Sequence, residues 1–199
     1  MTLRIGYLIF DDAEELDFVG PWEVFTMGNS VQAGVHENLM IAEHDRPIQC
    51  RKGMRVLPHV TTANCPKLDI LLIPGGQGTR REVENKPLLE WIARTAAGCQ
   101  WVTSVCTGAL LLTAAGPARG KRVTTHWGFI EGLRARGEAA EVLERVRYVR
   151  DGNVVTAAGV SAGIDMALWL TGQLHTPDFA RHVQRAMEYD PAPPYAAEV

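Results

Sequence analysis

The stretch WVTSVCTGALLL, residues 101–112, decides the fold of this chain. Its first five residues have the apolar and β-branched character of a buried strand, and residues 107–115 have the pattern of a helix. A strand that passes into a helix within one or two residues forms a sharp elbow, and Cys106 lies at the bend. The helix N-terminus behind it offers partial positive charge and free N–H groups, which favour a thiolate. The sequence therefore predicts that Cys106 is a nucleophile with a lowered pKa.

Length and composition indicate one soluble globular domain, residues 1–199. Of these residues 46% are hydrophobic and 22% are charged, which is ordinary for a chain that builds one core. A net charge of −3 gives no basic field that would attract nucleic acid. The first apolar run is about seven residues long, too short for a secretory signal, and no run could span a bilayer. We therefore expect a cytoplasmic protein that binds neither nucleic acid nor membrane.

The four cysteines, Cys50, Cys65, Cys99 and Cys106, form no CxxC pair and have no metal-ligand spacing. We interpret them as reduced thiols, as is usual in the cytosol. A cysteine beside a strand is most often a small buried apolar side chain, and for Cys106 that alternative stays open. The six histidines show neither an HExxH nor an HxH pattern. We therefore expect no metal and no other cofactor.

Strands and helices alternate along the chain, which is typical of an α/β fold. The predicted strands cover residues 3–10, 39–43, 56–60, 68–73, 101–105, 123–125, 146–150 and 154–158. The predicted helices cover residues 18–27, 87–97, 107–115, 127–136, 161–174 and 177–187. Asp151-Gly152 indicates a hairpin turn, and Ser161 is expected to cap the longest helix. The proline-rich tail that begins at Asp190 is expected to lie extended over the surface.

Continuous apolar strands in this order predict a mostly parallel sheet with helices on both faces, a three-layer sandwich. In such sheets, ligands bind at the carboxyl ends of the strands. Three loops should open there: the acidic loop after the first strand, Pro74-Gly75-Gly76, and the elbow at Cys106. A binding site is therefore expected at this edge of the sheet.

Five motifs, in the same order, make the chain resemble the ThiJ/PfpI superfamily. They are AEELDFVGPWEVF (13–25), LLIPGGQGT (71–79), VTSVCTGALLLTAAG (102–116), GKRVTTHW (120–127), and GVSAGIDMAL (159–168) with EYDPAPP (188–194). The resemblance extends from residue 5 to about residue 192 and is strongest to the isocyanide hydratases. It implies a flavodoxin-like sandwich of the class I glutamine-amidotransferase type, a small-molecule substrate, no cofactor and a homodimer.

The resemblance also implies a role for single residues at the expected site. Cys106 would be the nucleophile, held in a strained backbone conformation, and Asp17 would be its acidic partner. The hydroxyl and backbone N–H of Thr107 would reach the reacting group. Gly75 and Gly76 would bring bare backbone close to the sulfur, with the Gly76 N–H helping to form an anion hole.

A physical argument supports the role of Asp17. A carboxyl group close to a thiolate has a raised pKa because of like-charge repulsion and desolvation, so it can hold a proton near neutral pH. Such a proton can stabilise the thiolate and pass to a substrate. The alternative is that Asp17 only caps the following helix, and Gly75 and Gly76 can equally form a tight turn without chemistry. His126 is implied to lie near the pocket without acting as the base.

One departure from the superfamily pattern bears on the chemistry. Members that resemble peptidases or glyoxalase-type enzymes usually carry His directly after the nucleophile, where this chain has Thr107. This argues against a protease. We expect a lyase, a hydratase that converts a small isocyanide to an N-substituted formamide through a thioimidate on Cys106. The alternatives are a non-catalytic redox sensor or ligand-binding regulator that uses the same thiol, and a glyoxalase-type enzyme acting on α-oxoaldehydes.

Overall fold

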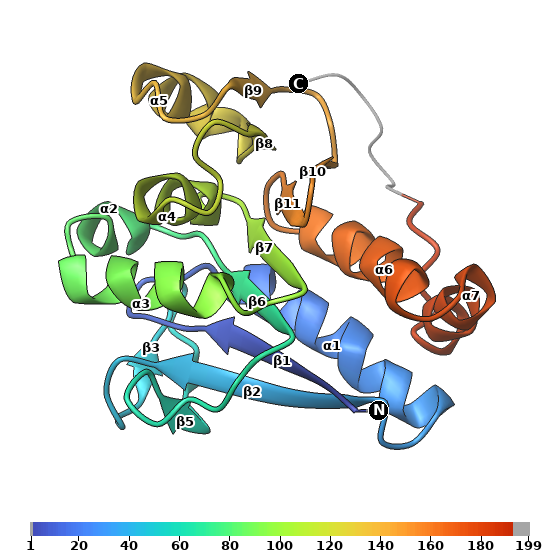
Figure 1. The fold of residues 1–199 in the computed structure, drawn as a ribbon. Helices are drawn as coiled ribbons and strands as arrows, with labels where there is room; N and C mark the ends of the chain where they lie inside the picture. The colour runs from blue at the N-terminus through green and yellow to red at the C-terminus, as the bar shows by residue number, and fades with distance from the viewer. Residues whose placement is uncertain (1, 193–199) are drawn as a thin grey trace.

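A single large sheet organises this chain. The computed structural model describes residues 2–192, and its seven-stranded sheet has the order β10-β11-β7-β6-β1-β2-β5 (Figure 1). Neighbouring strands are parallel except β10 and β11, which form the antiparallel hairpin predicted at Asp151-Gly152. The prediction of a mostly parallel sheet is confirmed.

The strands are short, and three minor pieces of structure accompany them. The strands of the large sheet are β1 (Leu3–Leu8), β2 (His36–Ala42), β5 (Val60–Thr61), β6 (Ile70–Ile73), β7 (Trp101–Val105), β10 (Tyr148–Asp151) and β11 (Val154–Ala157). Two small sheets pair β3 (Ile48–Gln49) with β4 (Arg55–Val56) and β8 (Arg122–Thr124) with β9 (Glu141–Leu143). The 3-10 helix η1 (Trp127–Phe129) and α5 (Ile130–Ala135) accompany β8 and β9.

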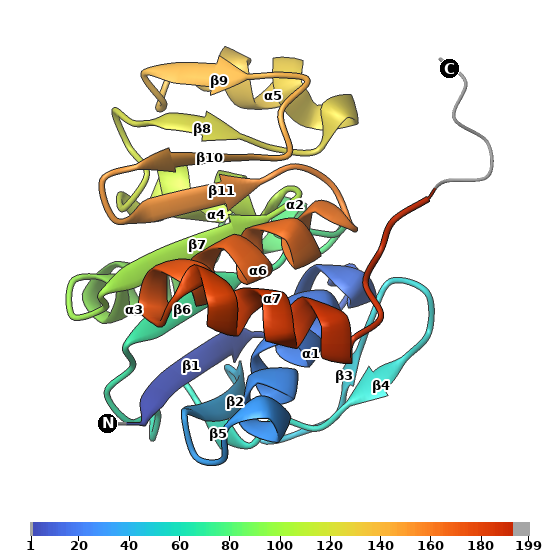
Figure 2. The ribbon, with the colours of Figure 1, turned by 90° about the vertical axis from the view of Figure 1, so that its right-hand side faces the viewer.

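Helices cover both faces of the large sheet, which gives the expected three layers (Figures 1 and 2). One face carries α1 (Glu15–Val31), α6 (Ala162–Leu174) and α7 (Pro177–Ala186), which pack against one another. The other face carries α2 (Thr79–Glu82), α3 (Lys86–Ala96) and α4 (Gly108–Ala115). No helix of the described residues is long and apolar enough to cross a membrane.

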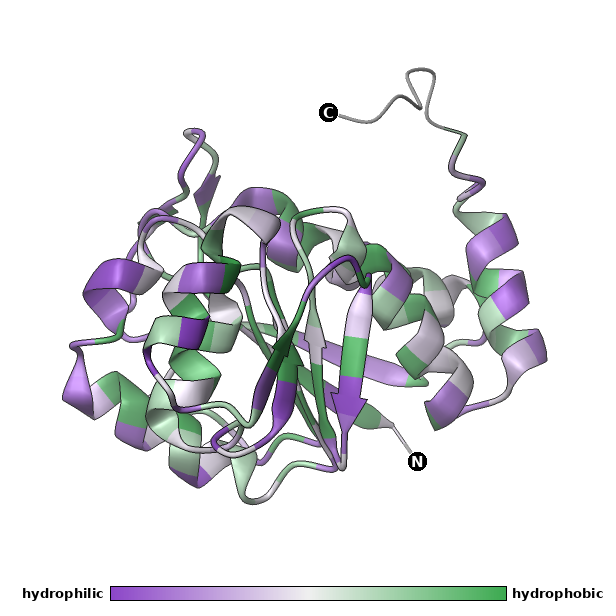
Figure 3. Cartoon of the chain, turned by 90° about the horizontal axis from the view of Figure 1, so that it is seen from above, coloured by the Kyte–Doolittle hydropathy of each residue, from purple (hydrophilic) through white to green (hydrophobic). Residues whose placement is uncertain are grey.

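The core lies between these layers because the strands are apolar on both faces. Every residue of β6 and β11 is buried, and so are the last four residues of β7. Figure 3 shows hydrophobic residues gathered along the strands, with many hydrophilic residues on the helices outside them. At the carboxyl ends of the strands, the loops after β1, β6 and β7 come together.

Three predicted features differ from the structure, each for a local reason. The strand predicted at residues 56–60 is wrong: Pro58 lies between two short strands, so Val56 pairs with β3 and Val60 pairs with β2. The helix predicted at residues 127–136 is divided into η1 and α5. Ser161 already has helical dihedral angles and makes no capping hydrogen bond; its hydroxyl accepts instead from the Arg147 guanidinium at 3.2 Å.

The sequence analysis also missed elements that are too short to give a periodic pattern. These are β3, β9 and the four-residue helix α2. Helix α1 begins at Glu15 rather than at residue 18, which places Asp17 in its first turn. The extended tail was predicted for residues that lie mostly at 193–199, outside the described residues.

Candidate active site

Cys106 occupies the predicted elbow between β7 and α4. Its φ of 56° lies in the left-handed region, which costs a non-glycine residue about 1–3 kcal/mol. The surrounding backbone holds it there: the Cys106 N–H donates to the carbonyls of Ala157 (3.1 Å) and Ala158 (2.8 Å). The Cys106 carbonyl in turn accepts from the Thr125 hydroxyl at 2.8 Å. The sulfur is therefore fixed in position, with only 7% of the residue exposed.

Asp17 meets this thiol from the other face of the sheet. The residue is fully buried in the first turn of α1. Its Oδ2 accepts from the Gly75 N–H at 2.8 Å, while Oδ1 has no hydrogen-bond partner within the described residues. The Cys106 thiol lies close enough to lower the pKa of Asp17. Because the carboxylate binds a different loop and not its own helix end, the capping alternative is wrong.

Burial controls the proton affinity of the Asp17 carboxyl group. Desolvation raises the pKa of Asp17 to about 8, and the nearby Glu14 adds to the rise. The Gly75 N–H works in the opposite direction because it stabilises the carboxylate. The direction agrees with the sequence argument, and the carboxyl group holds its proton at neutral pH.

The pKa of Cys106 differs from the prediction. Burial, followed by repulsion from Asp17, raises the pKa of the thiol to about 12 instead of lowering it. The N–H and hydroxyl of Thr107 and the N–H of Gly76 oppose this rise, as predicted for a helix end, but they are the smaller effect. The two acids are coupled, because the charge on either one raises the pKa of the other. The first proton leaves the Asp17 carboxyl group near pH 8, and the proton that remains is on the Cys106 sulfur.

Gly75 and Gly76 lie against the elbow, and neither position has room for a side chain. A Cβ on Gly75 would come within 2.4 Å of the Thr107 nitrogen and 2.8 Å of the Cys106 Cβ. Gly76 has a φ of 110°, and a Cβ there would lie 2.4 Å from the Asp12 carbonyl oxygen. This crowding, in addition to the tight turn, explains why both positions are glycine.

The acidic loop and the glycine turn are tied together by their backbones. Ala13 and Gly76 form an isolated antiparallel bridge. The Glu14 N–H donates to the Gly75 carbonyl at 3.0 Å, and the Gly78 N–H donates to the Asp12 carbonyl at 3.1 Å. These bonds fix the first turn of α1, which carries Asp17, relative to the backbone N–H groups of the glycine turn.

Thr107 is buried beside the nucleophile, as predicted, and it belongs to a hydrogen-bond network that the sequence analysis missed. Its Oγ1 accepts from the Gly76 N–H at 3.0 Å and lies 3.1 Å from the hydroxyl of Thr79, which is fully buried. Thr79 itself donates to the Gly76 carbonyl at 2.8 Å. The available signal was the threonine that ends the LLIPGGQGT motif, directly after the glycine turn.

His126 lies next to the elbow but is not bonded to the acid or the thiol. Its Nδ1 accepts from the Gly128 N–H at 3.1 Å, and its ring packs so tightly on Gly159 that a Cβ there would lie 2.4 Å from the ring. Within residues 2–192 no hydrogen bond joins His126 to Cys106 or Asp17. The adjacent Trp127 is 84% exposed.

Two cavities flank this region, and Cys106 lines neither of them. One of about 540 Å³ lies beyond the loop at Ala158 and is lined by residues that include Thr125, His126 and Trp127. The other, of about 390 Å³, lies on the opposite side of α2.

All four cysteines fall within the described residues and none forms a disulfide. Burial raises the pKa of Cys50, Cys65 and Cys99, none of which has donors like those of Cys106.

Comparisons with known proteins agree with the observed fold. The sequence profile of the DJ-1/PfpI family matches residues 3–173. The isonitrile hydratase of Pseudomonas putida is 42% identical, over 98% of this chain and 82% of that protein. The Parkinson disease protein 7 homolog of Danio rerio is 27% identical, over 91% of this chain and 94% of that protein. The crystal structure of a ThiJ/PfpI family protein from Pseudomonas syringae superposes with a TM-score of 0.90 at 31% identity, covering 100% of this chain and 80% of that one.

Proposed function

Because this chain belongs to the DJ-1/PfpI family, we propose that it is a cysteine-dependent hydratase, a lyase that converts a small isocyanide into an N-substituted formamide. The overall reaction is R–NC + H₂O → R–NH–CHO. The observation that carries the proposal is the similarity to an isonitrile hydratase over nearly the whole chain, together with a buried Asp17 that shares its environment with the Cys106 thiol.

The first step adds the thiol across the isocyanide carbon. The reactive state is the pair that holds one proton: the Asp17 carboxylate takes the proton of the Cys106 thiol, which leaves Cys106 as the thiolate and Asp17 as the acid. The sulfur lone pair forms the C–S bond, and the Asp17 proton goes to the same carbon, giving the thioimidate R–N=CH–S–Cys106. The N–H groups of Thr107 and Gly76 hold the thiolate before it adds, since both already lower the pKa of Cys106.

The second step hydrolyses the thioimidate. The Asp17 carboxylate takes a proton from water as the hydroxide adds to the carbon, and that proton then passes to the nitrogen. The tetrahedral carbon now carries OH, NH–R and the sulfur. When it collapses, the hydroxyl proton returns to Asp17, the C–S bond breaks and Cys106 leaves with the bonding electrons as a thiolate. The formamide departs and the starting state of the pair is restored.

The residue after the nucleophile supports this chemistry over that of a cysteine–histidine hydrolase or a glyoxalase-type enzyme. Thr107 cannot take a proton as an imidazole would. His126, the histidine of the GKRVTTHW motif, accepts a hydrogen bond from Gly128 and makes none with the thiol. In this mechanism the proton is moved by Asp17, the titratable group that shares the thiol's environment.

The test is to incubate the purified protein with one alkyl and one aryl isocyanide and to follow formamide by NMR. We expect turnover by the wild type and by the matched control Cys65→Ser, and none by Cys106→Ala. Formamide production that survives Cys106→Ala would refute the proposal. Turnover of methylglyoxal without turnover of isocyanides would assign a glyoxalase-type function. Selective oxidation of Cys106 by dilute peroxide, with no turnover of either substrate, would assign a redox sensor.

We further propose that the protein works as a homodimer. Among the described residues, large apolar side chains are exposed at Leu16, Val31, Met54, Leu57 and Trp127, the last of them 84% exposed. Aromatic and methionine side chains such as Trp127 and Met54 are enriched where subunits meet. Sedimentation equilibrium should give twice the chain mass of 21.9 kDa, and a monomer at micromolar concentration would contradict this.

A further inference from the structure

The cavity of about 390 Å³ lies at the carboxyl ends of β1 and β2, and the hydratase reaction makes no use of it. This edge of an α/β sheet is where ligands commonly bind. The floor of the cavity is formed by buried apolar side chains of β1, of the loop after it, of β3 and of α3. They are Leu8, Ile9, Phe10, Ile48 and Leu88. Its size and its apolar floor suit a small organic molecule.

The polar rim of the cavity is organised by Asn85. Its Oδ1 accepts from the Leu88 N–H at 3.3 Å, which orients the side-chain amide at the start of α3. Its Nδ2 then donates to the Oε2 atoms of Glu43 and Glu82, both at 3.0 Å. The side chain of Glu82 is only 9% exposed. One neutral amide therefore holds two carboxylates next to each other, one of them almost completely buried.

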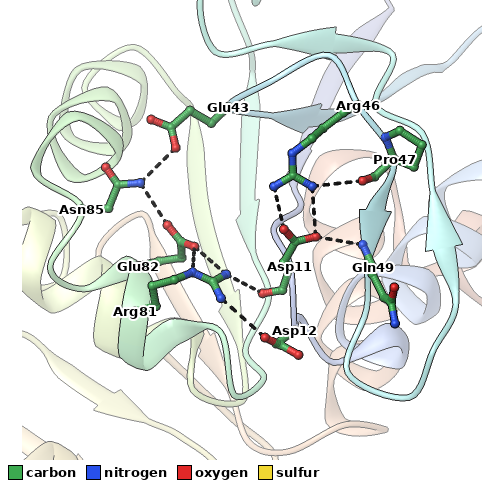
Figure 4. Close-up of polar contacts among 9 residues, drawn as sticks. All are labelled: Asp11, Asp12, Glu43, Arg46, Pro47, Gln49, Arg81, Glu82 and Asn85. Carbon is green, nitrogen blue, oxygen red and sulfur yellow. Dashed lines mark hydrogen bonds and ion pairs between the residues drawn. The ribbon is translucent and has the colours of Figure 1, made fainter.

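The two arginines that line the cavity are already paired with other acids (Figure 4). Arg46 donates to both carboxylate oxygens of Asp11, at 2.6 and 3.4 Å. Arg81 pairs with Glu82 at 2.8 Å and with Asp12 at 3.5 Å. Both guanidinium groups are thereby held at the edge of the cavity and have carboxylate partners of their own.

This pairing leaves the cavity with an excess of negative charge. Four carboxylates line it against two guanidinium groups. Within residues 2–192, Glu43 and Glu84 form no ion pair. Protonation of His44, which also lines the cavity, would offset only one of these two charges. A ligand that complements the cavity therefore carries positive charge.

The carboxylates are not arranged for a metal ion. Among the described residues, no three His, Cys, Asp or Glu side chains are grouped so that they could hold one. Metal cations that prefer oxygen need several such ligands at once. An ammonium group needs fewer, because each of its N–H bonds can be accepted by a single carboxylate oxygen. The apolar floor also favours a cation that carries a hydrocarbon part.

We propose that this cavity binds a small organic ammonium ion, whose charged group donates to Glu43 and whose hydrocarbon part covers the apolar floor. Glu43 is the expected anchor because its Oε1 accepts no hydrogen bond from the described residues. Its Oε2 is fixed by Asn85, so the carboxylate is already oriented before a ligand binds. The site is distinct from the active site, since neither Cys106 nor Asp17 lines it.

The probe for this site is benzylamine, and its matched neutral probe is benzyl alcohol, which has nearly the same shape and no charge. An alkylammonium group stays protonated at pH 7. Binding to the ¹⁵N-labelled protein is followed by NMR titration. We expect benzylamine to bind with a Kd of about 1 mM or tighter, and to shift the backbone amides of residues 43–48 and 82–88. Benzyl alcohol should bind at least about tenfold more weakly, because it lacks the charge-assisted hydrogen bond.

The decisive variant is Glu43→Gln, which keeps the shape of the side chain and removes its charge. Its matched control is Glu90→Gln, because Glu90 lies in α3 outside the cavity and its side chain is 71% exposed. Glu43→Gln should weaken benzylamine binding about tenfold and leave the binding of benzyl alcohol unchanged. Glu90→Gln should behave as the wild type. Glu84→Gln, at an exposed position, should weaken benzylamine binding by a smaller factor.

Equal affinities of the wild type for the two probes would overturn the proposal. So would benzylamine shifts that do not saturate by about 10 mM, or that map to another surface. If Glu43→Gln does not fold, Glu84→Gln decides, since unchanged benzylamine binding would show that the charge of the rim has no effect. The hydratase function is tested separately by formamide production, because the titrations contain no isocyanide.

Discussion

Replacing Asp17 with asparagine should stabilise the protein while abolishing its hydratase activity. Asparagine has the same shape and can keep the hydrogen bond from the Gly75 N–H, which is 2.8 Å long in the native protein. It cannot hold or transfer an acidic proton, so the activity should fall at least about a hundredfold. It also removes a carboxyl group whose charged form is strongly disfavoured by burial.

The size and pH dependence of the stabilisation follow from the pKa of Asp17. The pKa is about 8 in the folded protein, against an ordinary value of 3.8. The folded state therefore binds a proton that the unfolded chain has released between these pH values, and the free energy of unfolding falls as pH rises. At 1.36 kcal/mol per pKa unit, the difference corresponds to roughly 5 kcal/mol at pH 8 and above. The gain from Asp17→Asn should be close to zero near pH 4 and largest at pH 8.

Chemical denaturation at a series of pH values between 4 and 8.5 measures this difference. The matched control is Asp178→Asn, because Asp178 also lies in the first turn of a helix but its side chain is 80% exposed. The control should show no gain that grows with pH. A free-energy difference between wild type and Asp17→Asn that stays constant across this range would refute the assignment of a buried, protonated carboxyl group.

Three further predictions follow from the same geometry. The rate constant for isocyanide turnover should rise about tenfold between pH 7 and pH 8.5, because the pair loses its first proton, from Asp17, near the pKa of about 8. A rate that falls over this range would contradict a reactive pair that holds one proton. Cys106→Gly should raise the thermal stability, since glycine relieves a φ of 56° that costs about 1–3 kcal/mol, and an unchanged midpoint would argue against strain at the elbow. Gly76→Ala should lose roughly 3 kcal/mol more stability than Gly53→Ala, because both glycines have positive φ but only Gly76 is crowded. Equal losses of stability in urea denaturation would contradict the crowding at Gly76.

The parts of the site that could be predicted are those carried by local pattern. The change from a β-branched run to a helix around Cys106 fixed the elbow, and the strand-ending turn at Gly75 and Gly76 fixed the edge of the sheet where it would lie. The rule that parallel strands bring their carboxyl ends to one side gathered the three loops, and the family resemblance implied that Asp17 is the partner of Cys106.

The features that could not be predicted depend on how deeply a group is buried in the folded protein or on very short helices and strands. The sign of the Cys106 pKa shift could not be read from the chain, because burial outweighs the helix end and burial is a property of the assembled layers. Thr79 was missed because α2 spans four residues and shows no periodicity. The strand predicted at residues 56–60 failed because its two ends pair with different sheets on either side of Pro58.

The intermediate on sulfur is where the account can be tested most directly. Rapid mixing of the enzyme with excess isocyanide, followed by acid quenching and intact-protein mass spectrometry, should reveal a species heavier by one isocyanide. Peptide mapping should place the added mass on Cys106, and it should decay at the rate at which formamide appears. The contradicting result is steady formamide production with no adduct on the protein at any time during turnover. It would mean that water adds to the isocyanide without forming a covalent bond to the thiol first.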